Sequence, residues 1–274
     1  FMASVEAVAQ ENGAVISSLS AQGVAVFPAD DDYTGLWREL AGARRCISFA
    51  LDGPADVSAQ ARWMGSHWQV QADTPEGSLE FTLQVAGRHN VKNALAALAC
   101  AQAAGVPLAA VAQGLSHFEP VQGRSRARRL TLATQPERAL VLVDDSYNAN
   151  PDSVRAAIEV MRDLPGPHLL VLGDMGEVGE RGPQFHAEVG AYARALGIEQ
   201  LWCTGALMRH AAQAFPGAQH FERIDELLAQ LASALPGYAS VLVKGSRFMR
   251  MERVVQAIEE RATLAALAQE EPAC

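Results

Sequence analysis

The stretch VLVDDSYNANPDSV, residues 141–154, decides the fold of this chain. An apolar run with the composition of a buried strand stops in two aspartates, a polar loop follows, and a helical pattern begins near Asp152. The same alternation of a short apolar run and an amphipathic helix continues toward the end of the chain. Because strands that alternate with helices form parallel sheets, the sequence predicts a doubly wound α/β sheet in this region.

The alternation places five strands, each followed by a helix. Strands are expected at 139–145, 168–174, 200–205, 218–222 and 240–246, and helices at 152–164, 183–196, 206–215, 224–235 and 251–262. Residues 1–118 differ, because a first helix is followed by half-exposed strands and then by helices. These strands are expected at 23–31, 45–51, 68–73 and 79–87, and the helices at 90–105 and 107–115. Residues 118–129 have the composition of a linker, so two domains are predicted, 1–118 and 119–274.

Composition and charge exclude several classes of function. The formal net charge of -9 argues against nucleic acid as a partner, although a pocket with local cationic groups can still bind a small anion. The cysteines Cys46, Cys100, Cys203 and Cys274 form no CxxC pair, so neither a zinc site nor a disulfide framework is indicated, and a reducing cytoplasm fits best. No apolar run reaches the roughly 20 residues of a membrane span, and no membrane insertion is expected.

Three polar segments follow predicted strands of the second region: DDSYNAN (144–150), GDMGEVGERG (173–182) and KGSR (244–247). In a doubly wound sheet, ligands bind beyond the carboxyl ends of the strands, so the three segments predict one site. Each segment also has a simpler interpretation. Asp145, Ser146 and Asn150 fit a strand end and a helix cap, the glycine-rich segment fits a turn, and Lys244 with Arg247 fits a solvated pair.

A fourth segment, GRHNVKNALAA (87–97), lies in the first region. Asn90 and Asn93 are three residues apart at a predicted helix N-terminus, where backbone N–H groups and the helix dipole favour phosphate or a polar ring edge. The alternative is that Asn90 only caps the helix and His89 is a packed loop histidine. His186, on a later helix, is more often structural than catalytic.

Taken in order, GRHNVKNALAAL, the Gly123–Arg124 pair, DDSYNANPDS, LGDMGEVG and VKGSRFMRME resemble the Mur ligase family of peptidoglycan synthesis. The closest likeness is to the branch that joins D-alanyl-D-alanine to UDP-N-acetylmuramoyl-tripeptide. The resemblance implies the later part of a central ATP-binding domain, followed by a Rossmann-like C-terminal domain. A P-loop would lie on a missing N-terminal portion, because Lys92 and Lys244 each follow a valine rather than a glycine. This chain alone is therefore expected to be inactive.

The resemblance also implies cofactors, substrates and residue roles. ATP and Mg²⁺ would convert the substrate carboxylate to an acyl phosphate, which the amine of D-alanyl-D-alanine then displaces. Closure of the C-terminal domain would deliver Arg124 and Asp145 to the nucleotide and exclude water. The implied catalytic residues are Arg124 and Lys244. The implied nucleotide-binding residues are His89, Asn90, Asn93, Arg124, Asp145, Tyr147, Asn148 and Asn150. The implied substrate-binding residues are Asp174, Glu177, Ser246 and Arg247.

The sequence departs from the family pattern at two positions; at the first, either this branch replaces the usual group or the alignment of the segment is shifted. A carbamylated lysine that helps to hold magnesium in relatives corresponds to Asn12, which cannot be carbamylated, and Tyr147 stands where some relatives have lysine. No metal-binding residue is therefore predicted. The alternatives are another amide ligase of the superfamily, such as an amino-acid-adding ligase or a folylpolyglutamate synthetase, and a non-catalytic ligand-binding module.

Overall fold

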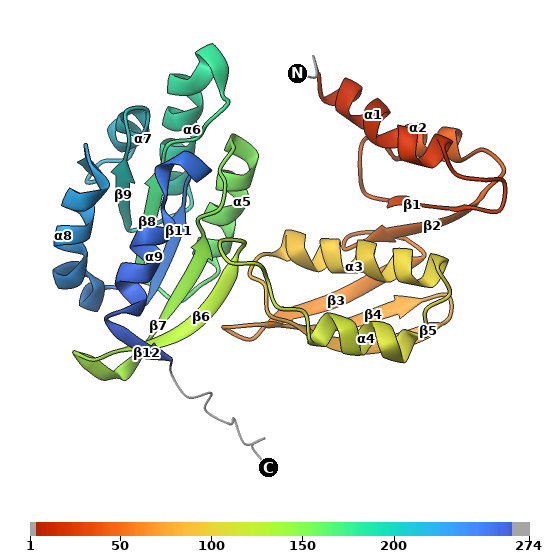
Figure 1. Ribbon diagram of the computed structural model, residues 1–274, viewed down its shortest axis with the longest axis horizontal. Helices are drawn as coiled ribbons and strands as arrows, with labels where there is room; N and C mark the ends of the chain where they lie inside the picture. Colours follow the sequence, from red (N-terminus) through yellow and green to blue (C-terminus); the bar gives the residue numbers. More distant parts are fainter. Residues whose placement is uncertain (1–3, 265–274) are drawn as a thin grey trace. The chain divides into compact units, whose positions relative to one another are not determined.

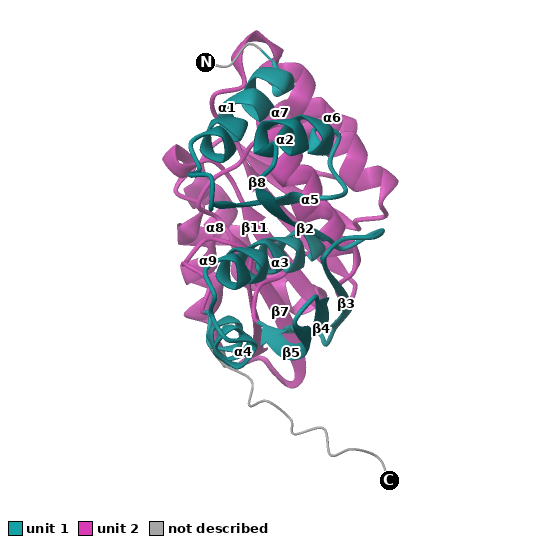
Figure 2. Cartoon of the chain, turned by 90° about the vertical axis from the view of Figure 1, so that its right-hand side faces the viewer, with its two compact units in different colours: residues 1–83, 88–118 teal, residues 84–87, 119–274 magenta. Residues whose placement is uncertain are grey.

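The computed structural model describes residues 4–264 of the chain, so Cys274 lies outside the described residues. The chain divides into two compact units (Figure 2). The first unit comprises residues 1–83 and 88–118, and the second unit comprises residues 84–87 and 119–274. Each unit has its own sheet, and each is described separately below.

The first unit contains a mixed five-stranded sheet with the order β1-β2-β3-β4-β5. Its strands are β1 Val24–Pro28, β2 Arg45–Ala50, β3 Val57–Trp63, β4 Trp68–Thr74 and β5 Gly77–Leu83. Strands β1 to β3 pair in parallel, whereas β3, β4 and β5 pair antiparallel. The helices are α1 Val5–Ser17, α2 Thr34–Ala41, α3 Arg88–Ala103 and α4 Leu108–Ser116. Helix α3 packs on β1, β2 and β3, and α4 packs on β5.

Two elements of the first unit were not predicted. Strand β3 has a weak apolar pattern, and antiparallel pairing with β4 places Trp63 opposite Trp68, with their ring centroids 5.2 Å apart. Helix α2 is short, but Trp37 and Leu40 pack against the cluster around Ile16, Ala25 and Phe27. Contacts distant in the sequence therefore decide both elements, as is common for short segments.

The second unit contains a seven-stranded sheet with the order β10-β9-β8-β11-β7-β6-β12 (Figure 1). Its strands are β6 Arg126–Leu132, β7 Gln135–Asp145, β8 His168–Gly173, β9 Gln200–Thr204, β10 Gln219–Phe221, β11 Ser240–Lys244 and β12 Ala262–Leu264. Strands β10, β9, β8, β11 and β7 are parallel. Strand β8 is buried along its whole length, which explains its continuous apolar run.

The helices of the second unit form two groups, as a doubly wound sheet requires. They are α5 Pro151–Arg162, α6 Gly182–Ala195, α7 Met208–Ala214, α8 Ile224–Ala234 and α9 Glu252–Glu259. Helix α6 contacts both α5 and α7, whereas α8 contacts α9. The chain runs outward from β7 through β8 and β9 to β10, and then returns to place β11 between β8 and β7. The loops that follow β7, β11 and β8 are therefore neighbours.

The predicted linker at residues 118–129 is wrong in its second half. Residues 126–132 form β6, which pairs antiparallel with β7 and, on its other edge, with β12. Arginines give this segment the composition of a linker, but Arg128 forms an ion pair with Glu259 of α9 and is largely shielded from solvent. In the described part of the chain, no helix has the length and hydrophobicity needed to cross a membrane.

Candidate functional site

The three predicted polar segments of the second unit meet at the carboxyl ends of β7, β8 and β11, which are neighbours in the sheet. The register pairs Lys244 of β11 with Asp145 of β7 on one side and with Leu172 of β8 on the other. An open pocket of about 870 Å³ lies beside them. It is lined by residues 147–152, 176–178 and 246–248 and by Phe185 of α6. The prediction that these segments form one cluster is confirmed.

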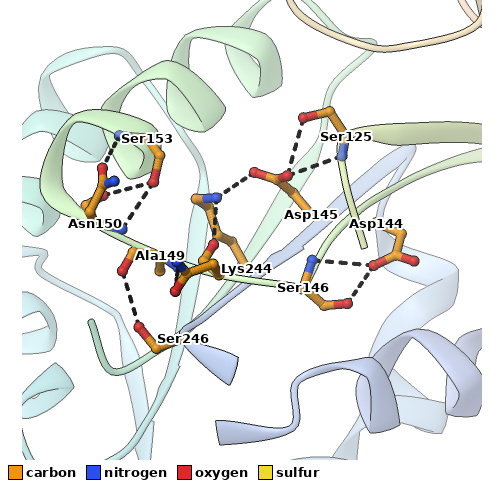
Figure 3. A network of polar contacts seen from close by, with 10 residues as sticks. Ser125, Asp144, Asp145, Ser146, Ala149, Asn150, Ser153, Lys244 and Ser246 are labelled. Carbon is orange, nitrogen blue, oxygen red and sulfur yellow. Dashed lines mark hydrogen bonds and ion pairs between the residues drawn. The ribbon is translucent and has the colours of Figure 1, made fainter. Parts of the chain in front are cut away.

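A buried ion pair lies at the centre of this cluster. Lys244 Nζ donates to Asp145 Oδ2 at 2.6 Å, the contact that Figure 3 shows, and to the Asn148 carbonyl oxygen at 2.9 Å. The other carboxylate oxygen of Asp145 accepts from the Ser125 backbone N–H at 3.0 Å and from its hydroxyl at 3.1 Å. Only 3% of Lys244 is exposed. Because this ammonium is enclosed by Asp145 and Asn148, the contacts favour a positioning role for Lys244 over the predicted catalytic one.

Asp144, which was not predicted as a site residue, holds the turn that carries Arg124. It is fully buried, and its carboxylate accepts from the Gly123 N–H at 3.0 Å, the Ser146 N–H at 3.2 Å and the Ser146 hydroxyl at 2.6 Å. Successive side chains of a strand point to opposite faces, so Asp144 and Asp145 reach the turn from different sides. The two consecutive aspartates at the end of an apolar strand were the sequence signal for this arrangement.

Arg124 and Arg247 both lie over the ring of Tyr147. The guanidinium carbons are 4.4 Å and 5.7 Å from the ring centroid, within the range of a cation–π interaction. Tyr147 remains 41% exposed, and both Tyr147 and Arg247 line the pocket. The aromatic ring thus lies beside two cationic side chains, of which Arg247 lines the pocket and Arg124 does not, and this arrangement suits an anionic group.

The two asparagines of the first polar segment have local roles. Asn150 caps α5, because its side-chain oxygen accepts from the Ser153 N–H at 2.8 Å while the Ser153 hydroxyl accepts from the Asn150 N–H at 3.0 Å. Asn148 accepts from the Ala149 N–H through its own side chain at 2.9 Å. The simpler interpretation of Asn150 as a helix cap is therefore confirmed. Both residues still line the pocket.

Asp174 also has a structural environment. Its carboxylate accepts from the Met208 N–H at 2.8 Å and from the Leu207 N–H at 3.1 Å, and the residue is 7% exposed. These hydrogen bonds satisfy backbone N–H groups at the start of α7 that have no partner within the helix. They engage the side chain that was predicted to bind substrate, and Asp174 is absent from the pocket lining, so a positioning role is favoured for it.

Glu177 lies in the pocket lining with a strained backbone. Its φ angle is 57°, in the left-handed region that a residue with a Cβ atom rarely adopts. Such strain persists where surrounding contacts enforce it, and it is concentrated at functional sites. Glu177 therefore remains the strongest candidate among the predicted substrate-binding residues.

Replacement of Glu177 with glycine is expected to raise the free energy of unfolding by about 1 kcal/mol, because glycine adopts a positive φ angle without steric cost. Urea denaturation of the Glu177→Gly variant measures this gain. Gly179, which has a φ angle of 59°, supplies the reverse control. A Gly179→Ala variant should lose a similar amount of free energy of unfolding. Equal stability of wild type and Glu177→Gly would show that the Glu177 backbone is not strained.

The imidazole of His186 fixes the backbone beside Asp174. Its Nδ1 lies 2.7 Å from the Gly182 carbonyl oxygen, which can only accept, so Nδ1 carries the proton and Nε2 accepts from the Met175 N–H at 3.0 Å. His186 is fully buried, and burial lowers its pKa from the ordinary value. The prediction that His186 is structural agrees with these contacts.

We expect His186 to make the protein less stable in mild acid. Below about pH 6.5, the unfolded chain binds a proton at His186 that the folded chain resists, so stability falls as pH decreases toward the lowered folded pKa. The slope from one such group is at most about 1.4 kcal/mol per pH unit. Urea midpoints of wild type and His186→Gln between pH 7.5 and 5.5 test this. Parallel pH profiles would show that His186 is not responsible.

The remaining predicted nucleotide-binding residues belong to the first unit. Helix α3 begins at Arg88, so Asn90 lies inside its first turn and is not the cap. The Asn93 side-chain amide donates to Asn90 Oδ1 at 3.2 Å, which confirms that the two asparagines share one face. His89 precedes them in the same turn. Their binding of nucleotide stays a prediction.

The side chains that most often bind metals do not form clusters in the described residues. Residues 4–264 contain no group of three or more histidine, cysteine, aspartate or glutamate side chains placed to hold one. Asn12 is exposed on α1, so this position supplies no anionic ligand either.

Comparison with known proteins relates both units to one family. Residues 1–101 match the Mur ligase middle domain, and residues 128–247 match the Mur ligase glutamate ligase domain. The chain is 34% identical over 95% of its length to the UDP-N-acetylmuramoyl-tripeptide–D-alanyl-D-alanine ligase of Escherichia coli, of which it covers 57%. It is 33% identical to the enzyme of the same name from Haemophilus influenzae, of which it covers 56%.

Solved structures show the same relationship. A crystal structure of MurF from Acinetobacter baumannii superimposes with a TM-score of 0.82 and 31% identity, over 94% of this chain and 56% of that one. A MurF ligase from Thermotoga maritima in complex with ADP, at 22% identity, has the same fold with a TM-score of 0.79. The chain thus spans a little more than half the length of the relatives it matches.

Proposed function

Because this chain belongs to the Mur ligase family, we propose that it is part of an ATP-dependent ligase that joins D-alanyl-D-alanine to UDP-N-acetylmuramoyl-tripeptide in peptidoglycan synthesis. The observation that carries the proposal is the 34% identity with the Escherichia coli ligase over 95% of the chain. The ligase would act in the cytoplasm, where ATP is available. The P-loop would be supplied by the portion of the relatives that this chain does not contain.

The lining of the pocket in the second unit favours an acceptor substrate that carries one positive and one negative charge. Asp152 and Glu177 place carboxylates in its lining, and Arg247 places a guanidinium there. A dipeptide with a free amino group and a free carboxylate matches this combination, because an ammonium pairs with the acids and a carboxylate pairs with arginine. We therefore place D-alanyl-D-alanine in this pocket.

In the proposed reaction, the role of these residues is to bind and orient the reactants. In the proposed sequence, the peptide carboxylate attacks the γ-phosphorus of ATP and ADP leaves, which gives an acyl phosphate. The neutral amine of the dipeptide then attacks the acyl carbon, and phosphate leaves as the amide forms. The acceptor ammonium must lose its proton before this attack, and Glu177 and Asp152 are the carboxylates placed to take it.

The nucleotide roles follow the same proposal. Arg124 would bind phosphate oxygens, since it projects from a turn held by Asp144 and Asp145 and its charge is not buried in an ion pair with either carboxylate. Asn90 and Asn93 would bind the adenine side of ATP. Asp145 would bind the ribose, for which its carboxylate must rearrange relative to Lys244 or Ser125. Mg²⁺, when bound, would neutralise phosphate charge.

The proposal is tested by restoring the missing portion. The chain is joined to the N-terminal part of the Escherichia coli relative and supplied with ATP, Mg²⁺, UDP-N-acetylmuramoyl-tripeptide and D-alanyl-D-alanine. Phosphate release and a pentapeptide product, detected by mass spectrometry, are the expected result. Arg124→Ala should reduce the rate at least about 100-fold, because removal of one charge-stabilising group costs that much.

Two outcomes would change the proposal. Formation of an amide with a single amino acid such as glutamate, in place of the dipeptide, would identify another amide ligase of the superfamily. A folded hybrid that binds ATP but forms no amide with any acceptor would instead support a ligand-binding module. Arg129→Ala, a change of the same charge on an exposed position of β6, is the matched control and should leave the rate unchanged.

A further inference from the structure

The hydroxyl group of Ser246 joins the three loops that form the pocket. It donates to the Ala149 carbonyl oxygen at 3.0 Å and accepts from the Gly176 N–H at 2.7 Å (Figure 3 shows the contact with Ala149). Ala149 follows β7, Gly176 follows β8, and Ser246 follows β11. Only 3% of Ser246 is exposed. One side chain thus fixes the separation of all three loops.

These contacts leave the Ser246 hydroxyl with little capacity for a substrate. A hydroxyl has one proton to donate, and this proton is already directed at the Ala149 carbonyl. One of its two lone pairs is directed at the Gly176 N–H. A substrate that accepted from this hydroxyl would take the donor away from the carbonyl oxygen of the buried Ala149, at a cost of about 1–3 kcal/mol, so only the second lone pair remains for a substrate donor.

The segment from Asp174 to Gly176 is held from two further directions. The Asp174 carbonyl oxygen accepts from the Ser246 N–H at 3.0 Å, and the Asp174 carboxylate is held by the N-terminus of α7. The Met175 N–H is held by His186 of α6. Glu177, with its strained φ angle of 57°, comes immediately after this fixed segment. The fixed position of this segment therefore limits the backbone conformation that Glu177 can adopt.

We infer that Ser246 is a positioning residue whose hydroxyl holds the Gly176 peptide, and thereby keeps Glu177 in the left-handed conformation that sets its carboxylate in the pocket wall. The inference rests on the proposed function, because it assigns Glu177 to the ammonium end of the acceptor dipeptide. Glu177 is then the specificity-determining residue, and Ser246 acts on the acceptor only through it. Without the Ser246 hydroxyl, the strain at Glu177 has one restraint fewer and the backbone can relax.

The first test uses the chain without ligand. Hydrogen exchange at the Gly176 amide and the backbone φ angle of Glu177, both measured by NMR, are compared in wild type and Ser246→Ala. We expect exchange at Gly176 to accelerate at least tenfold and the population with positive φ at Glu177 to fall. Ser233→Ala removes an exposed hydroxyl that donates to the Gln230 carbonyl oxygen of its own helix, so this control should change neither quantity.

The second test is a double-mutant cycle with D-alanyl-D-alanine as the probe, titrated by calorimetry. Ser246→Ala and Glu177→Gln should each weaken binding at least fivefold, and the double variant should bind no more weakly than Glu177→Gln alone. Such non-additivity distinguishes action through Glu177 from a general loss of structure.

The two tests separate the inference from the proposed function. If wild type does not bind the dipeptide, the proposed acceptor is wrong, and the NMR test alone then decides the role of Ser246. An unchanged Gly176 amide and an unchanged Glu177 φ angle in Ser246→Ala would overturn the inference. Fully additive losses in the cycle would also overturn it, because Ser246 would then act on the dipeptide independently of Glu177.

Discussion

Replacement of Lys244 with methionine is expected to lower the free energy of unfolding of the second unit by about 3 kcal/mol, because removal of one partner leaves a charge buried without compensation. Asp145 would keep its contacts with Ser125 but lose its cation, and the Asn148 carbonyl oxygen would lose its donor. Methionine retains most of the length of the lysine chain, so the loss reports on the ammonium rather than on packing. Urea denaturation, monitored by hydrogen exchange at amides of each unit, measures the free energy of unfolding of the two units separately.

The chain contains a matched control for this prediction. Its other lysine, Lys92, pairs with Asp30 at the same distance of 2.6 Å, but these two side chains are 31% and 23% exposed. The corresponding values for Lys244 and Asp145 are 4% and 15%. Lys92→Met makes the same change in net charge and should cost less than about 1 kcal/mol. Equal losses from the two variants would show that burial of the Lys244 pair is not decisive.

Replacement of Gly190 with alanine is expected to destabilise the second unit by about 3 kcal/mol or more. Gly190 lies on α6 where this helix packs against α7. A methyl group there would stand 2.7 Å from the Ala211 Cα atom and 2.8 Å from its carbonyl carbon, and closer still to its carbonyl oxygen. These are backbone atoms, so α7 must move as a unit, and such overpacking is costly. Thermal denaturation of the second unit measures the loss.

The control is a glycine in a helix with open space around it. Gly114 lies on the exposed side of α4, and an added Cβ atom would meet nothing within 4 Å. Gly114→Ala should stabilise the first unit by about 0.5–1 kcal/mol, because alanine favours the helix more than glycine does. If Gly190→Ala were also stabilising, the close approach of α6 and α7 would not exist.

The candidate site was only partly predictable from the sequence. The polar segments after the strands were visible as breaks in apolar runs, and the rule for parallel sheets placed them together. The sequence did not indicate that Ser246 forms hydrogen bonds with Ala149 and Gly176, or that Asp174 forms them with α7, since these partners lie between 34 and 97 residues away. A polar residue beside a pocket therefore looks the same in the sequence whether it binds a ligand or holds a loop.

The sequence by itself determined the alternation of strands and helices in the second unit, because the period of the apolar residues is a local property of the chain. Only the tertiary structure decided the order of the strands, which sets β11 between β7 and β8 and brings Lys244 to Asp145 across 99 residues of chain. It also made a strand of the arginine-rich residues 126–132, since pairing with β7 and the ion pair of Arg128 with Glu259 outweigh their local preference. Local periodicity fixes what each segment becomes, whereas the burial of charge depends on partners that the fold alone supplies.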